Sequence, residues 1–289
     1  MTLQSPWFSL VALALMIAAI LAGAGLRRRW PEHHTNRETI ELLQTTVTLL
    51  ATFAAIVLGL LITSAKADFD TLQNDIRSFG ATLVQLDYNL EGLGPDAIPI
   101  RHRLVRYAAT TVTAIWTSEP APPGDYYPRL APTQRSRMGA TTATLGQMLE
   151  RANTSLESLV PDSSVQARRQ GSAQRMMNIA ITERWHFAEA SRGTLSTPFF
   201  AVLVFWAVVI YVCLGLSAPL NHVSFLTMTL SAIALSSALF VMIDLYTPFT
   251  GIFKVSSQPL RAAIGEMLAL PNGRPAPLTA PCSQFSPKC

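Results

Sequence analysis

The sequence predicts an all-α integral membrane protein with four transmembrane helices and a helical extramembrane bundle inserted between the second and the third. Only 14% of the 289 residues are charged, whereas soluble domains carry about 25%, and the mean hydropathy is +0.30. Residues 225–243 contain no Asp, Glu, Lys or Arg, which matches the length of helix that crosses a bilayer. The small formal net charge of +4 and the lack of a long basic block argue against nucleic acid as a partner.

The first predicted element is a transmembrane helix over residues 7–26, directly followed by Arg27, Arg28 and Arg29. A cleaved signal peptide would carry its basic residues before the apolar run. We therefore interpret residues 1–41 as an uncleaved transmembrane helix and a basic loop.

The second predicted transmembrane helix covers residues 42–65 and presents a face of small and hydroxyl-bearing side chains. Its members recur at steps of three and four residues, so they share one side of a helix: Thr45, Thr48, Thr52, Ala55 and Gly59. Two interpretations are open. The hydroxyl groups line a water-filled path for ions, or the small residues let this helix pack closely against another.

Residues 66–192 are predicted to form an extramembrane bundle of about four helices, because charged residues of both signs are frequent and strand-like alternation is absent. The bundle begins with a heptad pattern that continues the second span as one long helix and buries a seam against other helices or subunits. Its members are Phe69, Leu72, Ile76, Phe79, Leu83, Leu86 and Leu90. In the next helix, Arg101, Arg103 and Arg106 form either a solvated or ion-paired face, or a site for an anion or lipid headgroup.

The third and fourth transmembrane helices are predicted within residues 193–246, because the uncharged run 193–243 is too long for one helix. A turn and an amphipathic helix follow in residues 247–270, and residues 271–289 form a Pro-rich flexible tail. The candidate membrane-exit motif is Asp244, Pro248, Phe249 and Gly251. Asp244 either caps the turn at Pro248 or contacts ions at a pore mouth, since charge at that depth is costly unless it is paired or solvated.

Orientation and the cysteines remain open at this stage. The arginines between the first two spans favour a cytoplasmic loop by the positive-inside rule, which predicts a periplasmic location for residues 66–192 in a bacterial inner membrane. Cys282 and Cys289 in the tail form a disulfide if the tail lies outside the cytoplasm, or remain two free thiols.

No motif for an enzyme, a metal site or a cofactor is recognisable. The sequence contains no Gly-rich phosphate loop, no nucleophile elbow and no Cys/His spacing typical of zinc. We therefore expect a non-enzymatic protein without a cofactor.

Two parts of the chain resemble the bestrophin-like bacterial membrane proteins. The more specific match lies near the end: Asp244-Leu245, Pro248-Phe249 and Gly251, then Val255-Ser256 and Pro259-Leu260. The looser match covers residues 42–107 and includes Arg103-Leu104 and Tyr107. The resemblance implies four transmembrane helices, a helical extramembrane part between the second and third, and distant kinship with bestrophin ion channels, which are pentamers that pass anions in animals and can pass cations in bacteria.

The sequence also departs from this family in two places. Gln73-Asn74-Asp75 stands where an acidic pair is often seen, and no acidic cluster suited to a calcium clasp follows the last span, so calcium gating is not expected. Bestrophins keep the corresponding helical segment in the cytoplasm, which conflicts with the orientation that the loop arginines predict.

The sequence thus leads to one expected function and one alternative. The first is a homo-oligomer in the lipid bilayer that forms or regulates a path for small inorganic ions. The alternative is a non-conducting structural or signalling membrane protein whose extramembrane helical bundle binds a protein partner.

Overall fold

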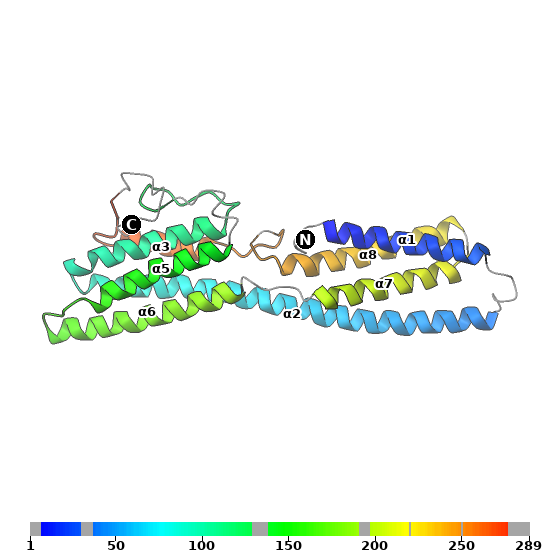
Figure 1. The fold of residues 1–289 in the computed structure, drawn as a ribbon, viewed down its shortest axis with the longest axis horizontal. Helices are drawn as coiled ribbons and strands as arrows, with labels where there is room; N and C mark the ends of the chain where they lie inside the picture. Colours follow the sequence, from blue (N-terminus) through cyan, green and yellow to red (C-terminus); the bar gives the residue numbers. More distant parts are fainter. Residues whose placement is uncertain are drawn as a thin grey trace. The chain divides into compact units, whose positions relative to one another are not determined.

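The computed structural model describes residues 7–29, 37–128, 138–190, 197–219, 221–249 and 251–276. Within these ranges the regular structure is helical, with no strand. The elements are α1 (Trp7–Arg29), α2 (Arg37–Glu91), the short 3-10 helix η2 (Pro95–Ala97), α3 (Ile98–Ile115), α5 (Met138–Glu157), α6 (Ser164–Ala190), α7 (Thr197–Ser217), α8 (His222–Leu245) and α9 (Gln258–Ala269) (Figure 1).

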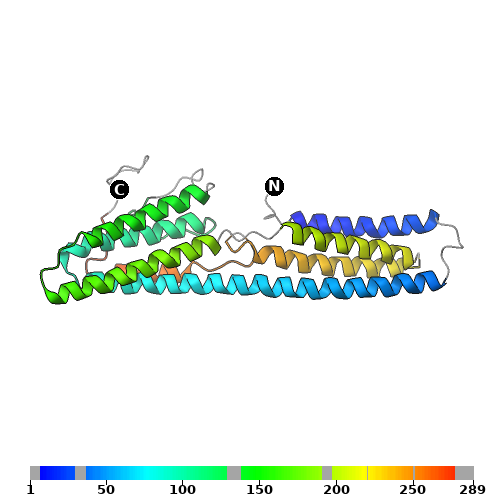
Figure 2. The same ribbon diagram turned by 60° about the horizontal axis from the view of Figure 1, so that its bottom comes forward.

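Among the described residues, four helices are long and apolar enough to cross a membrane: α1, α2, α7 and α8. The predicted all-helical class is confirmed, and the number of candidate spans agrees with the predicted four. α2 is one continuous helix of 55 residues, as the uninterrupted heptad pattern after the second span predicted. Its amino-terminal part runs alongside α7 and α8, and α1 lies beyond them (Figure 2).

The chain divides into two compact units. Unit 1 comprises Met1–Phe69 and Gly193–Phe253, and unit 2 comprises Asp70–Arg192 and Lys254–Cys289. Along the chain, α3, α5 and α6 follow α2 and precede α7.

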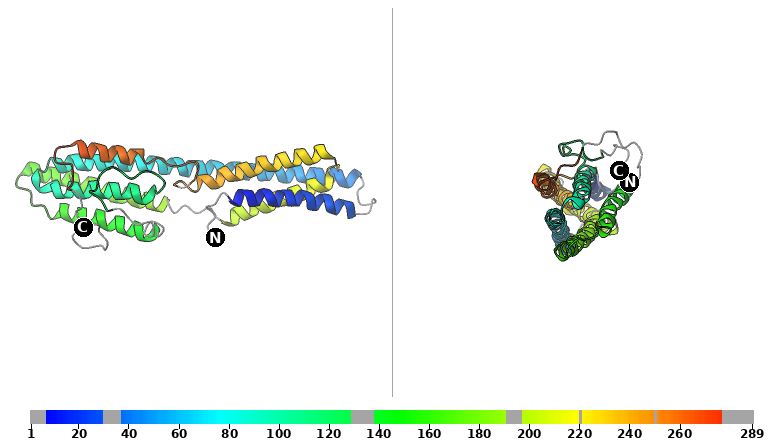
Figure 3. Two further views of the ribbon diagram at one scale, coloured as in Figure 1. Left: turned by 90° about the horizontal axis from the view of Figure 1, so that it is seen from above. Right: turned by 90° about the vertical axis from the view of Figure 1, so that its left-hand side faces the viewer.

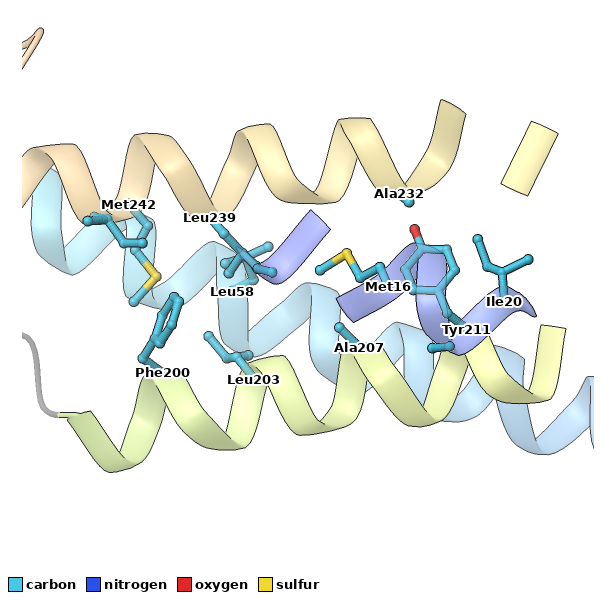
Figure 4. Close-up of a cluster of buried hydrophobic side chains, with 13 residues drawn as sticks. Met16, Ile20, Leu58, Phe200, Leu203, Ala207, Tyr211, Ala232, Leu239 and Met242 are labelled. Atoms are coloured by element: carbon cyan, nitrogen blue, oxygen red, sulfur yellow. The ribbon is translucent and has the colours of Figure 1, made fainter. Parts of the chain in front are cut away.

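Unit 1 has an apolar core between its four helices. Its buried cluster includes Met16 and Ile20 of α1, Leu58 of α2, Leu203 of α7 and Leu239 of α8 (Figure 4). α1 packs most extensively against α7, where Gly23 and Gly215 allow the two backbones to meet. A Cβ on Gly215 would lie 2.5 Å from the carbonyl oxygen of Ile20, so only glycine permits this separation.

Unit 2 is a helical bundle in which α3 packs against α5 and α9, and α5 against α6 (Figure 3). The predicted heptad seam of α2 is buried from Leu72 to Leu90, and Phe69 is half-buried. The chain after α8 returns to this core, where the indole Nε1 of Trp116 donates a hydrogen bond to the carbonyl of Val255 at 2.7 Å. Pro259, at the start of α9, lies against Gly80 of α2.

Candidate functional site

The hydroxyl face of α2 is exposed along its length in unit 1. Thr45, Thr48, Thr52 and Gly59 are all exposed, and a Cβ on Gly59 would meet open space. Only 6% of the residues in the apolar stretch of α2 are buried, against 28–33% of those in the other three candidate spans. α2 is therefore the candidate span that its own chain covers least.

Two different surfaces alternate around the exposed part of α2. At about 100° per residue, the hydroxyl face lies beside a stripe of large apolar side chains, formed by Leu49, Phe53, Ile56 and Leu60, which are all exposed. The buried residues Val47 and Leu58 lie on a third side. An open groove between α2 and α7 is lined by Thr48, Thr52 and Ala55 on one wall, with Ile210 and Leu214 on the other.

Each threonine of the hydroxyl face donates a hydrogen bond within its own helix. Thr45 bonds to the carbonyl of Glu41 at 2.9 Å, Thr48 to that of Gln44 at 2.8 Å and Thr52 to that of Thr48 at 2.8 Å. Such bonds satisfy the hydroxyl proton and leave the oxygen lone pairs directed outwards. The face can therefore offer oxygen acceptors to an ion or to water. Its hydroxyl protons have hydrogen-bond partners even where water is absent.

Asp244 organises the turn that ends α8. Its side chain is buried, and its two carboxylate oxygens accept the backbone N–H groups of Ile252 at 2.9 Å and Phe253 at 2.7 Å. Its own carbonyl accepts the N–H of Thr247 at 3.0 Å. Hydrogen bonds from neutral donors to a carboxylate are stronger than neutral pairs, so Asp244 ties the chain after the turn back to the end of the helix.

The other motif residues follow from this turn. Pro248 and Phe249 lie within it and are half-buried. A Cβ on Gly251 would lie 2.5 Å from Oδ1 of Asp244, so only glycine leaves room for the carboxylate. The carboxylate thus bonds to the backbone of the turn, and its two predicted roles, turn capping and ion contact, stay predictions.

The three arginines of α3 bond to other parts of unit 2. Arg101 is buried and forms a bidentate ion pair with buried Asp87, at 2.9 and 3.0 Å; hydrogen bonding to Asp87 raises the pKa of Arg101. Arg103 donates to Ser155 of α5. Arg106 donates to the carbonyl of Ala276 at 3.3 Å. The adjacency of Asp87 to the seam residue Leu86 was the one signal for the buried pair.

The remaining predicted site residues are the tail cysteines, and both Cys282 and Cys289 lie outside the described residues. Among the residues that are described, no group of three or more His, Cys, Asp or Glu side chains is placed to hold a metal ion.

Comparison with known proteins explains why these motifs occur together. A family model described as the Bestrophin-like domain matches residues 13–260, a range that contains both the hydroxyl face and the Asp244 turn. The chain belongs to the bestrophin-like family. No match was found among the curated proteins.

Solved structures share the fold of this bestrophin-like chain. One point variant of a bacterial bestrophin homolog from Klebsiella pneumoniae has a TM-score of 0.64 at 15% identity, covering 90% of this chain and 95% of that one. A second variant of it gives 0.64 at 14% identity, with 89% and 97% covered. A structure described as a membrane protein gives 0.62 at 15% identity, with 94% and 99% covered. The fold of the bestrophin-like family therefore extends over most of the chain.

Proposed function

We propose that this bestrophin-like membrane protein is a subunit of a homo-oligomeric channel for small inorganic ions. The observation that carries the proposal is the exposure of the hydroxyl face of α2 on the span that its own chain covers least. In a bilayer, a hydroxyl oxygen that faces the lipid acyl chains has no hydrogen-bond donor or ion to contact. An oligomer would give Thr45, Thr48 and Thr52 an aqueous path to line, as oxygen-lined conduction paths require.

The exposed apolar stripe of α2 supports assembly from several copies. Leu49, Phe53, Ile56 and Leu60 adjoin the hydroxyl face, so a ring of copies can bury these side chains against a neighbour or constrict the path with them. In this arrangement unit 2 lies outside the bilayer, in the water next to one membrane surface. The loop arginines favour a periplasmic location for it, in a bacterial inner membrane.

Conductance measurements on α2 variants test the proposal. The purified oligomer is reconstituted into planar bilayers, and the wild type is compared with the Thr48→Val, Thr52→Val double variant. A hydroxyl-to-ion contact is worth about 1 kcal/mol, or roughly fivefold in rate, so conductance should fall at least fivefold.

The matched control is Thr46→Val. Thr46 lies on the same helix, is exposed and bonds to the carbonyl of Leu42 at 2.9 Å, but it is about 100° away from Thr45. Its replacement should leave the conductance unchanged. Absence of current from an intact wild-type oligomer would refute the channel.

A second function is favoured by the hydrogen bonds of the threonines themselves. Because each hydroxyl proton is satisfied by a carbonyl of its own helix, the face can pack dry against another helix. The protein would then be a non-conducting membrane scaffold whose unit 2 binds a protein partner. In that case the oligomer carries no current, and the double valine variant assembles as the wild type does.

A further inference from the structure

The packing of α1 determines which of its residues face away from the chain. Met16, Ile20 and Gly23 are buried against the other helices of unit 1. At about 100° per residue, Leu21, Gly25 and Arg29 lie on the opposite side of the helix, and Arg28 lies at the edge of that side. Gly23 lies in close contact with α7, which directs the buried side of α1 towards the rest of unit 1.

The outward face ends in two exposed arginines. Arg27 turns towards the chain and donates a hydrogen bond to the carbonyl of Ala218, at the end of α7. Arg28 and Arg29 are exposed. α2 begins at the same end of unit 1 (Figure 1), and its first turns carry Arg37, Glu38 and Glu41, so the described residues at this end include four arginines and two glutamates.

Directly below the arginines, the same face of α1 is apolar and exposed. Leu21 is 55% exposed, and a Cβ on Gly25 would meet open space. The chain therefore leaves this face uncovered along a helix that is long and apolar enough to span the bilayer.

We propose that Arg28 and Arg29, with the exposed face of α1 at Leu21 and Gly25, bind an anionic phospholipid. The two guanidinium groups would hold the phosphate, since arginine matches phosphate oxygens in geometry and charge. One acyl chain would run along the exposed apolar face. A free anion would gain nothing from the apolar part, and a zwitterionic lipid would offer no net charge. The inference does not depend on whether the oligomer conducts.

Lipid titration of the full-length chain in a neutral detergent tests the site. The unfolding temperature is followed as phosphatidylglycerol, or phosphatidylcholine with identical acyl chains, is added. Phosphatidylglycerol should raise it saturably, and phosphatidylcholine and inorganic phosphate should not. A basic residue near an anionic surface contributes about 1 kcal/mol, or roughly fivefold in affinity. The Arg28→Gln, Arg29→Gln variant should therefore need roughly 25-fold more phosphatidylglycerol.

The matched control removes two exposed arginines from unit 2, Arg168→Gln and Arg175→Gln, and should titrate as the wild type does. An equal loss of the phosphatidylglycerol response in both variants would show that only net charge matters and would overturn the site. Loss of oligomer mass in the lipid-free Arg28→Gln, Arg29→Gln variant, with its phosphatidylglycerol response intact, would assign the face to a neighbouring copy instead. Should that variant not fold, added NaCl must weaken the wild-type response to phosphatidylglycerol; a salt-independent response contradicts the proposal.

Discussion

At the scale of single residues, burial in unit 2 changes the ionisation of a tyrosine side chain. Tyr107 of α3 is buried and meets the ring of Phe79 edge-on, with the centroids 6.2 Å apart. Burial raises the pKa of its phenol, and this effect outweighs the attraction of the Arg184 guanidinium, which acts in the opposite direction. The neutral phenol is therefore the form that the folded chain retains.

This shift predicts a loss of stability at high pH. Because the pKa of Tyr107 is higher in the folded state, its stabilising effect is complete below the unfolded value of about 10 and is lost as pH rises above it, at up to about 1.4 kcal/mol per pH unit. Denaturant unfolding of the detergent-solubilised chain between pH 8 and pH 11 measures it. Tyr107→Phe should flatten the decline, whereas the exposed Tyr88→Phe should not; equal slopes for both variants would contradict the assignment.

At the scale of elements, the contact between α1 and α7 depends on backbone approach. Gly23 and Gly215 face each other, and a Cβ on Gly23 would collide with the carbonyl oxygen of Val212. Without a hydrophobic force between helices in lipid, close packing is the main source of their association. One methyl group at this point therefore separates the two helices.

Two glycines of α1 offer a matched pair of variants. Gly23→Ala should destabilise unit 1 by about 1–3 kcal/mol, as overpacking does. Gly25→Ala, two residues further along, has open space around its Cβ and should be neutral or stabilising, since alanine favours helix. Unfolding of both variants in the same detergent measures the difference, and equal stabilities would show that the glycine contact does not hold the helices together.

The helices were predictable from sequence because their signals are local. The seam from Leu72 to Leu90 repeats within one helix, and the uncharged run 193–243 exceeds the length of one span. The contacts that complete the site join side chains to groups outside their own helix. The amides of Ile252 and Phe253 that meet Asp244 carry no side-chain signature, and the burial of Arg101 depends on Asp87 of another helix.

At the scale of the whole molecule, the open question of sidedness has a direct test. Val160, between α5 and α6, is 85% exposed, so a cysteine there is accessible to reagents in water. The arginines that close α1 favour a cytoplasmic loop after the first span, which predicts that Val160→Cys reacts with an impermeant maleimide in intact cells.

The labelling needs two comparisons. The background variant lacks Cys213, Cys282 and Cys289, and the cysteine at 160 is probed before and after permeabilisation. Reaction only after permeabilisation would place unit 2 in the cytoplasm, as bestrophins have it, and would show that the loop arginines do not set the topology of this chain.

The Asp244 turn has a consequence for biosynthesis. The aspartate leaves the ribosome several residues before Ile252 and Phe253, whose amides its carboxylate accepts in the folded chain. Until those amides arrive, the carboxylate depends on hydration, so water must reach the end of the nascent fourth span. A chain truncated just after α8 would contain every apolar residue of the fourth span and still lack the two backbone amides that bond to the Asp244 carboxylate.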